Sequence, residues 1–194
     1  MKFNFISTLF SNMPRLESKR LLFRAIKRAD LDDIYEYSSN PKTSKYLLWS
    51  PHKTISTTRE FIEIVLSKYK SRDYNDWAIV YKKTGKMIGT CGFTRIDEEN
   101  QLVEIGYVLN PDYWGAGLAT EAVERVLKFA FEVMNVNRVE AKFMFGNGAS
   151  LAVMKKVGMT FEGYQRDAIF AKGKFRTIGI ASILKKEYDL NKSF

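Results

Sequence analysis

Residues 102–121 read LVEIGYVLNPDYWGAGLATE, and this stretch contains the most informative transition in the chain. From Leu102 to Leu109 the composition is that of a β-strand. From Leu118 to Met134 apolar residues recur at helical spacing, which predicts a long amphipathic helix. Gly115 and Gly117 lie directly before that helix. The stretch therefore predicts a strand, a loop and a helix N-terminus in that order.

The glycine turn has the composition of an anion-binding site. Gly115 and Gly117 lack the side chains that would keep a ligand away from the backbone. The first N–H groups of a helix have no partner within the helix, and the helix dipole favours negative charge there. A pyrophosphate is the expected ligand. Such a turn also occurs where a helix packs closely on a strand, so the two glycines alone do not decide between these roles.

Two other nucleotide-binding motifs are disfavoured. A dinucleotide-binding turn would have a third glycine where this chain has Thr120, and an acidic residue about twenty residues later at the end of a second strand. That later position falls in the middle of the long helix. A Walker-type loop would end in Gly-Lys-Ser or Gly-Lys-Thr, which the stretch lacks.

The rest of the chain predicts a mixture of strands and helices. Thr57 and Glu60 have the spacing of a capping box at the start of a helix, and Val139, Ala141, Phe143 and Phe145 alternate along one face of a strand. The order of elements favours an α/β fold with antiparallel hairpins over a doubly wound sheet. Besides the strand and helix above, strands are predicted at 20–26, 77–81, 87–94, 138–145, 165–170 and 175–185, and helices at 30–37, 57–69 and 150–157.

Length and composition indicate one domain. The 194 residues include 45% hydrophobic residues and carry a formal net charge of +9. The basic residues are scattered, so direct binding of nucleic acid is not expected. The N-terminal residues make a poor signal peptide, because polar residues interrupt the apolar run, and we expect a cytoplasmic protein without a membrane anchor. We expect a lead-in at 1–13 and the domain at 14–190.

Cysteine and histidine are each present once. Because Cys91 is the single cysteine, an internal disulfide is excluded. Cys91 lies in an apolar stretch, so we expect its thiol to be packed in the core. His52 lies between Pro51 and Lys53 and is expected to be an exposed loop residue. No metal site is predicted, because the carboxylates show no ligand spacing.

Three segments in order resemble the GNAT superfamily of N-acetyltransferases, and within it the RimJ- and RimL-like branch that acetylates ribosomal-protein N-termini. They are PRLESKRLLFR at 14–24, the stretch from Gly106 to Ala122, and Asn147–Ser150 with Lys156–Met159. The resemblance covers residues 14–188. It departs from the superfamily at Met154, where many members have a tyrosine that protonates the thiolate, and at Thr177, where the branch usually has an aspartate.

The resemblance implies a central, mostly antiparallel sheet that is splayed at an acyl-CoA site and flanked by helices. Acetyl-CoA is the implied cofactor, and Asn147 corresponds to a residue that hydrogen-bonds its pantetheine arm. Glu104 is the candidate base that takes the ammonium proton, directly or through water, and an ordinary exposed strand glutamate is the alternative. Ser150 is a candidate both for the N-cap of its helix and for the acid that protonates the thiolate, and the two roles can coexist. Water is the alternative acid. The implied cofactor-binding residues are Tyr107, Val108, Leu109, Trp114, Gly115, Ala116, Gly117, Leu118, Ala119, Thr120 and Asn147.

The acceptor amine implied by the resemblance is the N-terminal α-amino group of a protein or peptide. A polyamine or an amino sugar remains an alternative, as does a non-catalytic acyl-CoA-binding module. The branch is also compatible with a homodimer formed through the sheet edge. Trp49, Tyr46 and Arg166 are candidates for the acceptor pocket, with packing or solvation an equal alternative for each.

Overall fold

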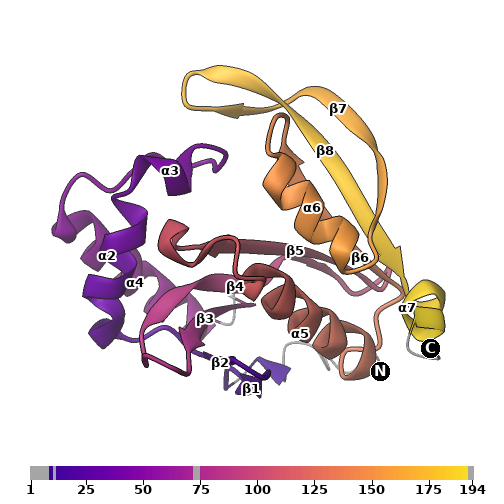
Figure 1. The fold of residues 1–194 in the computed structure, drawn as a ribbon, viewed down its shortest axis with the longest axis horizontal. Coiled ribbons are helices and arrows are strands. Elements are labelled where there is room, and N and C mark those ends of the chain that lie inside the picture. Colours follow the sequence, from indigo (N-terminus) through magenta and orange to yellow (C-terminus); the bar gives the residue numbers. More distant parts are fainter. Residues whose placement is uncertain (1–8, 11, 72–74, 192–194) are drawn as a thin grey trace.

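The computed structural model describes residues 9–10, 12–71 and 75–191. They form one eight-stranded sheet in the order β1-β2-β3-β4-β5-β6-β8-β7, with helices on both faces (Figure 1). All neighbouring strands are antiparallel except β5 and β6. The prediction of a mixed α/β fold with a mostly antiparallel sheet is confirmed.

The strands are β1 (Leu16–Glu17), β2 (Leu21–Arg24), β3 (Asn75–Tyr81), β4 (Met87–Asp97), β5 (Leu102–Leu109), β6 (Arg138–Met144), β7 (Thr160–Ala171) and β8 (Lys174–Leu184). The helices are α2 (Leu31–Ser38), α3 (Pro41–Ser44), α4 (Ile55–Ser71), α5 (Leu118–Glu132), α6 (Gly148–Lys156) and α7 (Lys185–Asn191), with short 3-10 turns η1 (Arg28–Asp30) and η2 (Pro111–Tyr113).

The two faces of the sheet carry separate cores. Trp77 and Ile79 of β3 pack in the larger core with α5, whereas Ala78, between them, packs in the smaller core with α2 and α4. Since successive strand residues point to opposite faces, α5 and the α2–α4 pair lie on opposite sides of the sheet. Cys91 is fully buried in the larger core, as predicted, and burial raises the pKa of its thiol well above the ordinary value.

The sheet parts between β5 and β6. These strands pair in parallel from Leu102↔Arg138 to Ile105↔Ala141, although β5 continues to Leu109 and β6 to Met144. β5 stays paired with β4 as far as Gly89↔Leu109, and β6 stays paired with β8 as far as Met144↔Ile178. The two halves of the sheet therefore diverge beyond Ile105, which is the splayed arrangement that the resemblance implied.

Several local predictions need correction. The α4 helix begins at Ile55, and the Thr57 amide donates to the Thr54 side chain, so Thr57 lies in the first turn and is not the cap. Phe145, predicted on a buried strand face, lies just beyond β6 and is 63% exposed. The short helices α3 and α7 were not predicted.

The N-terminal segment is described only in part, because residues 1–8 and 11 lie outside the described residues. Phe10, within the predicted lead-in, is buried and packs edge-on against Phe93 and Phe129. A helix long and apolar enough to cross a bilayer is absent from the part of the chain that the structure describes.

Candidate functional site

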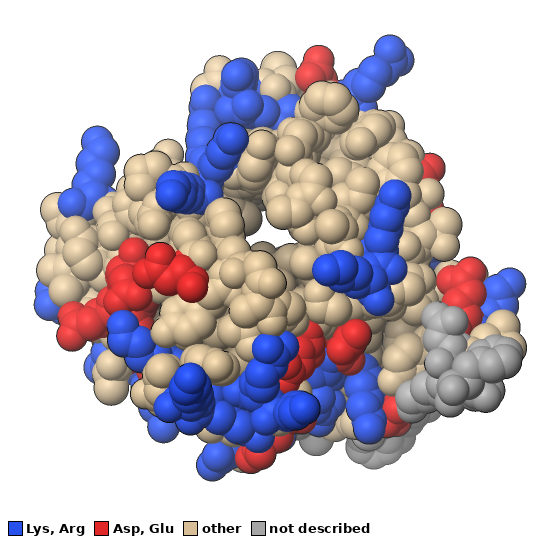
Figure 2. Space-filling view, in the orientation of Figure 1, with Lys and Arg blue, Asp and Glu red and all other residues tan. Residues whose placement is uncertain are grey.

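The gap between the diverging strands opens into a cavity of about 550 Å³. Its walls come from α3 and the following residues, the second half of β5, the turn before α5, and α6. Figure 2 shows an opening in this face of the molecule, with basic side chains around it. Of the predicted cofactor-binding residues, Ala116 alone is not among the residues that line this cavity.

The glycine turn is shaped so that its backbone faces the cavity. Gly115 and Gly117 both have φ of +75°, a left-handed conformation that L-residues with side chains rarely adopt. A Cβ atom on Gly115 would meet nothing within 4 Å, so the turn is open on that side. Gly117 is the N-cap of α5, and the next residues, Leu118 to Thr120, line the cavity. The free N–H groups of this first turn are thus available to an anion.

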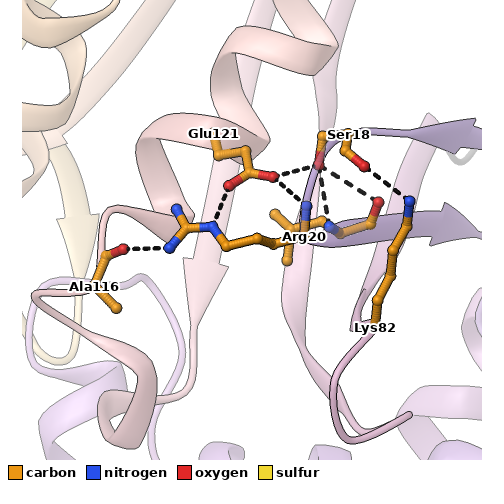
Figure 3. A network of polar contacts seen from close by, with 6 residues as sticks. Ser18, Arg20, Lys82, Ala116 and Glu121 are labelled. Atoms are coloured by element: carbon orange, nitrogen blue, oxygen red, sulfur yellow. Dashed lines mark hydrogen bonds and ion pairs between the residues drawn. The ribbon is translucent and has the colours of Figure 1, made fainter.

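Arg20 connects the turn to the sheet, a role that was not predicted from the sequence. Its Nη1 donates to the Ala116 carbonyl at 2.9 Å, and its Nε donates to Glu121 at 2.6 Å (Figure 3). Glu121 also accepts from the Arg20 amide at 2.7 Å and from the Ser18 hydroxyl at 2.8 Å. Burial raises the pKa of Glu121, but these hydrogen bonds and the Arg20 charge outweigh it and hold the pKa below the ordinary value. Glu121 is therefore ionised and keeps Arg20 beside the turn.

The charge of the cavity suits a phosphate-rich ligand. Lys42, Lys45 and Lys156 line it, and no Asp or Glu is among its described lining residues. The Arg20 guanidinium adds a fourth positive group, with Nη2 3.6 Å from where a Cβ on Gly117 would lie. The cation excess and the exposed backbone of the turn together fit the pyrophosphate and phosphate groups of coenzyme A.

Ser150 and Tyr107 form a hydroxyl pair in the cavity wall. Their oxygens are 2.8 Å apart, and the Tyr107 hydroxyl donates to the Ser150 carbonyl at 3.0 Å. The cap of α6 is Asn147, whose side chain accepts from the Ser150 amide, so the interpretation of Ser150 as the N-cap was wrong. The Ser150 hydroxyl is instead directed to Tyr107. Burial raises the pKa of Tyr107, which therefore stays protonated at neutral pH.

Glu104 lies on β5, as Tyr107 does, but it is not among the residues that line this cavity. Its carboxylate pairs with Lys142 of β6 and accepts a hydrogen bond from the Thr94 hydroxyl at 2.9 Å. The Glu104 backbone is at the last-but-one parallel pair before the strands separate. The ion pair thus crosses from β5 to β6 close to the point of divergence, and the catalytic role of Glu104 stays a prediction.

A second cavity of about 250 Å³ lies on the α2–α4 side of β5. Trp49 and His52 both line it, so His52 is not the exposed loop residue that was expected. Its ring nitrogen Nδ1 lies 2.8 Å from the Thr58 hydroxyl, and Thr58 is fully buried. Tyr46 lines the first cavity, whereas Arg166 is exposed on β7 and lines neither.

Comparison with known proteins matches residues 20–160 to the model of the acetyltransferase (GNAT) domain. The chain is 36% identical over 176 residues to an uncharacterised N-acetyltransferase, p20, of Bacillus licheniformis, covering 91% of this chain and 99% of that protein. A crystal structure of a GCN5-related N-acetyltransferase from Brucella melitensis superposes with a TM-score of 0.83 at 26% identity, covering 94% of this chain and 83% of that one.

Two more distant proteins differ in their acceptors. Spermidine N(1)-acetyltransferase of Escherichia coli is 23% identical, with 91% of each chain covered. The ribosomal L7/L12 α-N-protein acetyltransferase RimL, solved in complex with coenzyme A, shares the fold at a TM-score of 0.76 and 20% identity, covering 88% of this chain and 98% of that one. The family match, the near-complete coverage and the geometry of the turn agree: the chain belongs to the GNAT family and is an acetyl-CoA-dependent acetyltransferase.

Proposed function

We propose that the protein transfers the acetyl group of acetyl-CoA to the N-terminal α-amino group of a protein or peptide. The observation that carries this choice is the charge of the two cavities. Among the described residues that line them, Asp76 in the second cavity is the one carboxylate. A peptide N-terminus carries one ammonium group and needs one counter-charge, whereas a polyamine carries several. The net charge of +9 also opposes a polycationic acceptor.

The donor supplies a thioester whose carbonyl carbon is open to attack by an amine. The turn from Gly115 to Thr120, with Arg20 behind it, would hold the pyrophosphate. Alternate residues of β5 beyond Ile105 point backbone N–H and C=O groups into the gap left by β6, where they would hold the pantetheine arm and polarise the thioester oxygen.

The Ser150–Tyr107 pair would protonate the leaving sulfur. Met154, at the position of the superfamily's tyrosine, is buried and has no acidic proton, so it does not take that role. The Ser150 and Tyr107 hydroxyls both lie in the wall of the first cavity and share a hydrogen bond. Such a pair passes a proton with little rearrangement, because each oxygen both donates and accepts.

The test is the release of coenzyme A by the purified protein from acetyl-CoA and a panel of acceptors. Peptides that begin with Ala, Ser or Met are expected to release thiol, and the same peptides acetylated at the N-terminus are the matched control. Spermidine and amino sugars are expected to release less than a tenth as much. Release with spermidine but not with the peptides would refute the acceptor assignment, and acetyl-CoA binding without release from any amine would indicate a non-catalytic module.

A further inference from the structure

The two cavities share a lining residue, Val108 of β5. Val108 of β5 lines both cavities, so an acceptor in the second cavity and a donor in the first would meet at this residue. The volume of about 250 Å³ is below the roughly 300–1,000 Å³ of pockets for drug-sized ligands. It suits a group of the size of one amino-acid residue.

The walls of the second cavity suit an ammonium group. Tyr37, Trp49 and Phe61 are aromatic residues that line it, and Asp76 supplies a carboxylate. The face of an aromatic ring attracts cations. Burial, and next the charge of Asp76, raise the pKa of Tyr37, so the tyrosine is neutral at pH 7 and Asp76 supplies the negative charge among the described residues that line this cavity. A cation between these groups would gain both a counter-ion and aromatic contacts.

His52 is held in the wall of this cavity by one of its two ring nitrogens. Nδ1 lies 3.0 Å from the Ser38 hydroxyl and 2.8 Å from the Thr58 hydroxyl, and the His52 amide donates to the Ser38 carbonyl at 3.0 Å. The ring also packs between Trp49 and Phe61, at centroid distances of 5.6 and 6.0 Å. Every side-chain hydrogen bond of His52 found among the described residues uses Nδ1, which leaves Nε2 for a ligand.

The charge state of His52 suits a proton acceptor. Burial lowers its pKa below the ordinary value of about 6.5, so the ring is neutral at pH 7. The titratable groups that line the cavity with it are Tyr37 from α2 and Asp76 from β3. The remaining residues that line this cavity do not titrate: Ile34 and Ser38 from α2, Trp49 from the loop before α4, Phe61 from α4, Thr90 from β4 and Val108 from β5.

We propose that the second cavity receives the N-terminal residue of the acceptor, that Asp76 binds its ammonium group, and that Nε2 of His52 accepts the proton which frees the amine. This proposal rests on the proposed function. The freed nitrogen forms the amide bond with the thioester carbon while the C–S bond breaks. The ammonium group loses its first proton to His52, which passes it to solvent. The Ser150–Tyr107 pair gives a proton to the leaving sulfur. The new amide nitrogen loses a second proton, which restores the proton of that pair.

The proposal requires the tautomer with hydrogen on Nδ1. Because His52 is the only histidine in the sequence, the ring signals in a nitrogen–proton correlation spectrum need no assignment. We expect the Nδ1–H form at pH 7.5 in the unliganded protein, and a shift of the ring signals on addition of a Ser-initiated peptide. The N-acetylated peptide should leave the signals in place. The Nε2–H tautomer, or equal shifts with both peptides, would overturn the proposal.

Two substitutions separate proton transfer from packing. His52→Asn keeps a polar group near the Nδ1 position and removes Nε2, whereas His52→Gln keeps a polar group near Nε2 without basicity. Both are expected to lower kcat with the Ser-initiated peptide at least about a hundredfold and to abolish the acidic limb of the kcat/KM profile. The Kd for acetyl-CoA should change less than twofold. Asp76→Asn should raise KM for the peptide more than it lowers kcat.

The same assay distinguishes His52 from Glu104. The proposal for His52 is wrong if Glu104→Gln loses the acidic limb while His52→Asn keeps it and melts near the wild-type temperature. The proposed acetyl transfer to peptides is not contradicted by that result. If the wild type acetylates none of the peptides, the proposed function fails, and the spectrum of the wild-type protein still decides whether the second cavity binds an N-terminal amine at His52.

Discussion

Substitution of Arg20 by glutamine would test whether this side chain builds the coenzyme A site. The change removes the donor to the Ala116 carbonyl and the charge that faces Glu121, while the Arg20 backbone N–H and the Ser18 hydroxyl still bind the Glu121 carboxylate. The Glu121 side chain is only 15% exposed. Its charge would then be unbalanced next to the turn at which we expect the pyrophosphate to bind, so stability and cofactor affinity should fall together.

The size of both effects follows from the contacts. A hydrogen bond to a charged group contributes about 1.5–3 kcal/mol, and because the Arg20 side chain is 39% exposed we take about 1–2 kcal/mol for the loss of folding free energy. For a chain of this length that corresponds to a fall in melting temperature of roughly 2–8 °C. A charge at a helix N-terminus changes the free energy of anion binding there by up to about 2 kcal/mol. A loss of about 1–2 kcal/mol raises the Kd for coenzyme A roughly five- to thirtyfold.

Calorimetric titration with coenzyme A would measure the affinity, and Arg125→Gln is the matched control. Arg125 lies on α5, as Glu121 does, and its side chain donates to the Glu17 carbonyl of β1. The Arg125→Gln variant therefore loses one positive charge and one hydrogen bond to the sheet, but not at the glycine turn. Its Kd should change less than twofold. Adding Glu121→Gln to Arg20→Gln should recover at least half of the lost stability, because the unbalanced carboxylate is then gone. Equal affinities of the Arg20 and Arg125 variants would refute a specific role of Arg20.

Four further outcomes are expected. Gly117→Ala should lose about 1–2 kcal/mol of folding free energy because of its left-handed φ, whereas Gly148→Ala, at an unstrained helix position, should be neutral by thermal melting. Ser150→Ala should lower kcat roughly a hundredfold with the Kd for coenzyme A unchanged, as measured by steady-state kinetics and titration. Glu104→Gln should lower the melting temperature by breaking the Lys142 pair and should keep the acidic limb of the kcat/KM profile; loss of that limb in this variant would make Glu104 the base. Since the pKa of Glu121 is lowered, its contribution to stability is complete above its ordinary pKa and is lost as pH falls through the folded-state value; denaturant unfolding between pH 6 and 3 should show this loss, and the Glu121→Gln variant should lack it.

The parts of the fold that depend on local pattern were predictable. The strand from Leu102 to Leu109 was placed without error, and the helix from Leu118 ends within two residues of its predicted end. Alternation and helical spacing report which face of an element is buried, and that information lies within each segment. Phe145 continues the alternation in the sequence, but β6 ends at Met144, so the alternation no longer predicts which side chains are buried.

The parts of the site that depend on tertiary contact were not predictable. Arg20 and Glu121 are 101 residues apart, and a basic residue in an opening strand gives no sign of a partner in a distant helix. His52 was taken as exposed because its neighbours Pro51 and Lys53 are typical of a loop, yet the loop folds over the cavity and packs the ring between Trp49 and Phe61. The N-cap of α6 was predicted at Ser150 and lies at Asn147, because both residue types suit a cap and the residue type alone does not fix where the helix begins.

The position of the site follows from the one parallel strand pair in the described sheet. A parallel pair requires a crossover, and α5 supplies it between β5 and β6. The N-terminus of α5 must then lie near the C-terminal end of β5, which is also where β5 leaves β6 and presents unpaired backbone groups. The connectivity thus brings N–H groups that can bind phosphate close to backbone groups that can hold a thioester. The connectivity does not determine what lies on the opposite side of Val108, where Asp76 and His52 line the cavity that we propose for the acceptor.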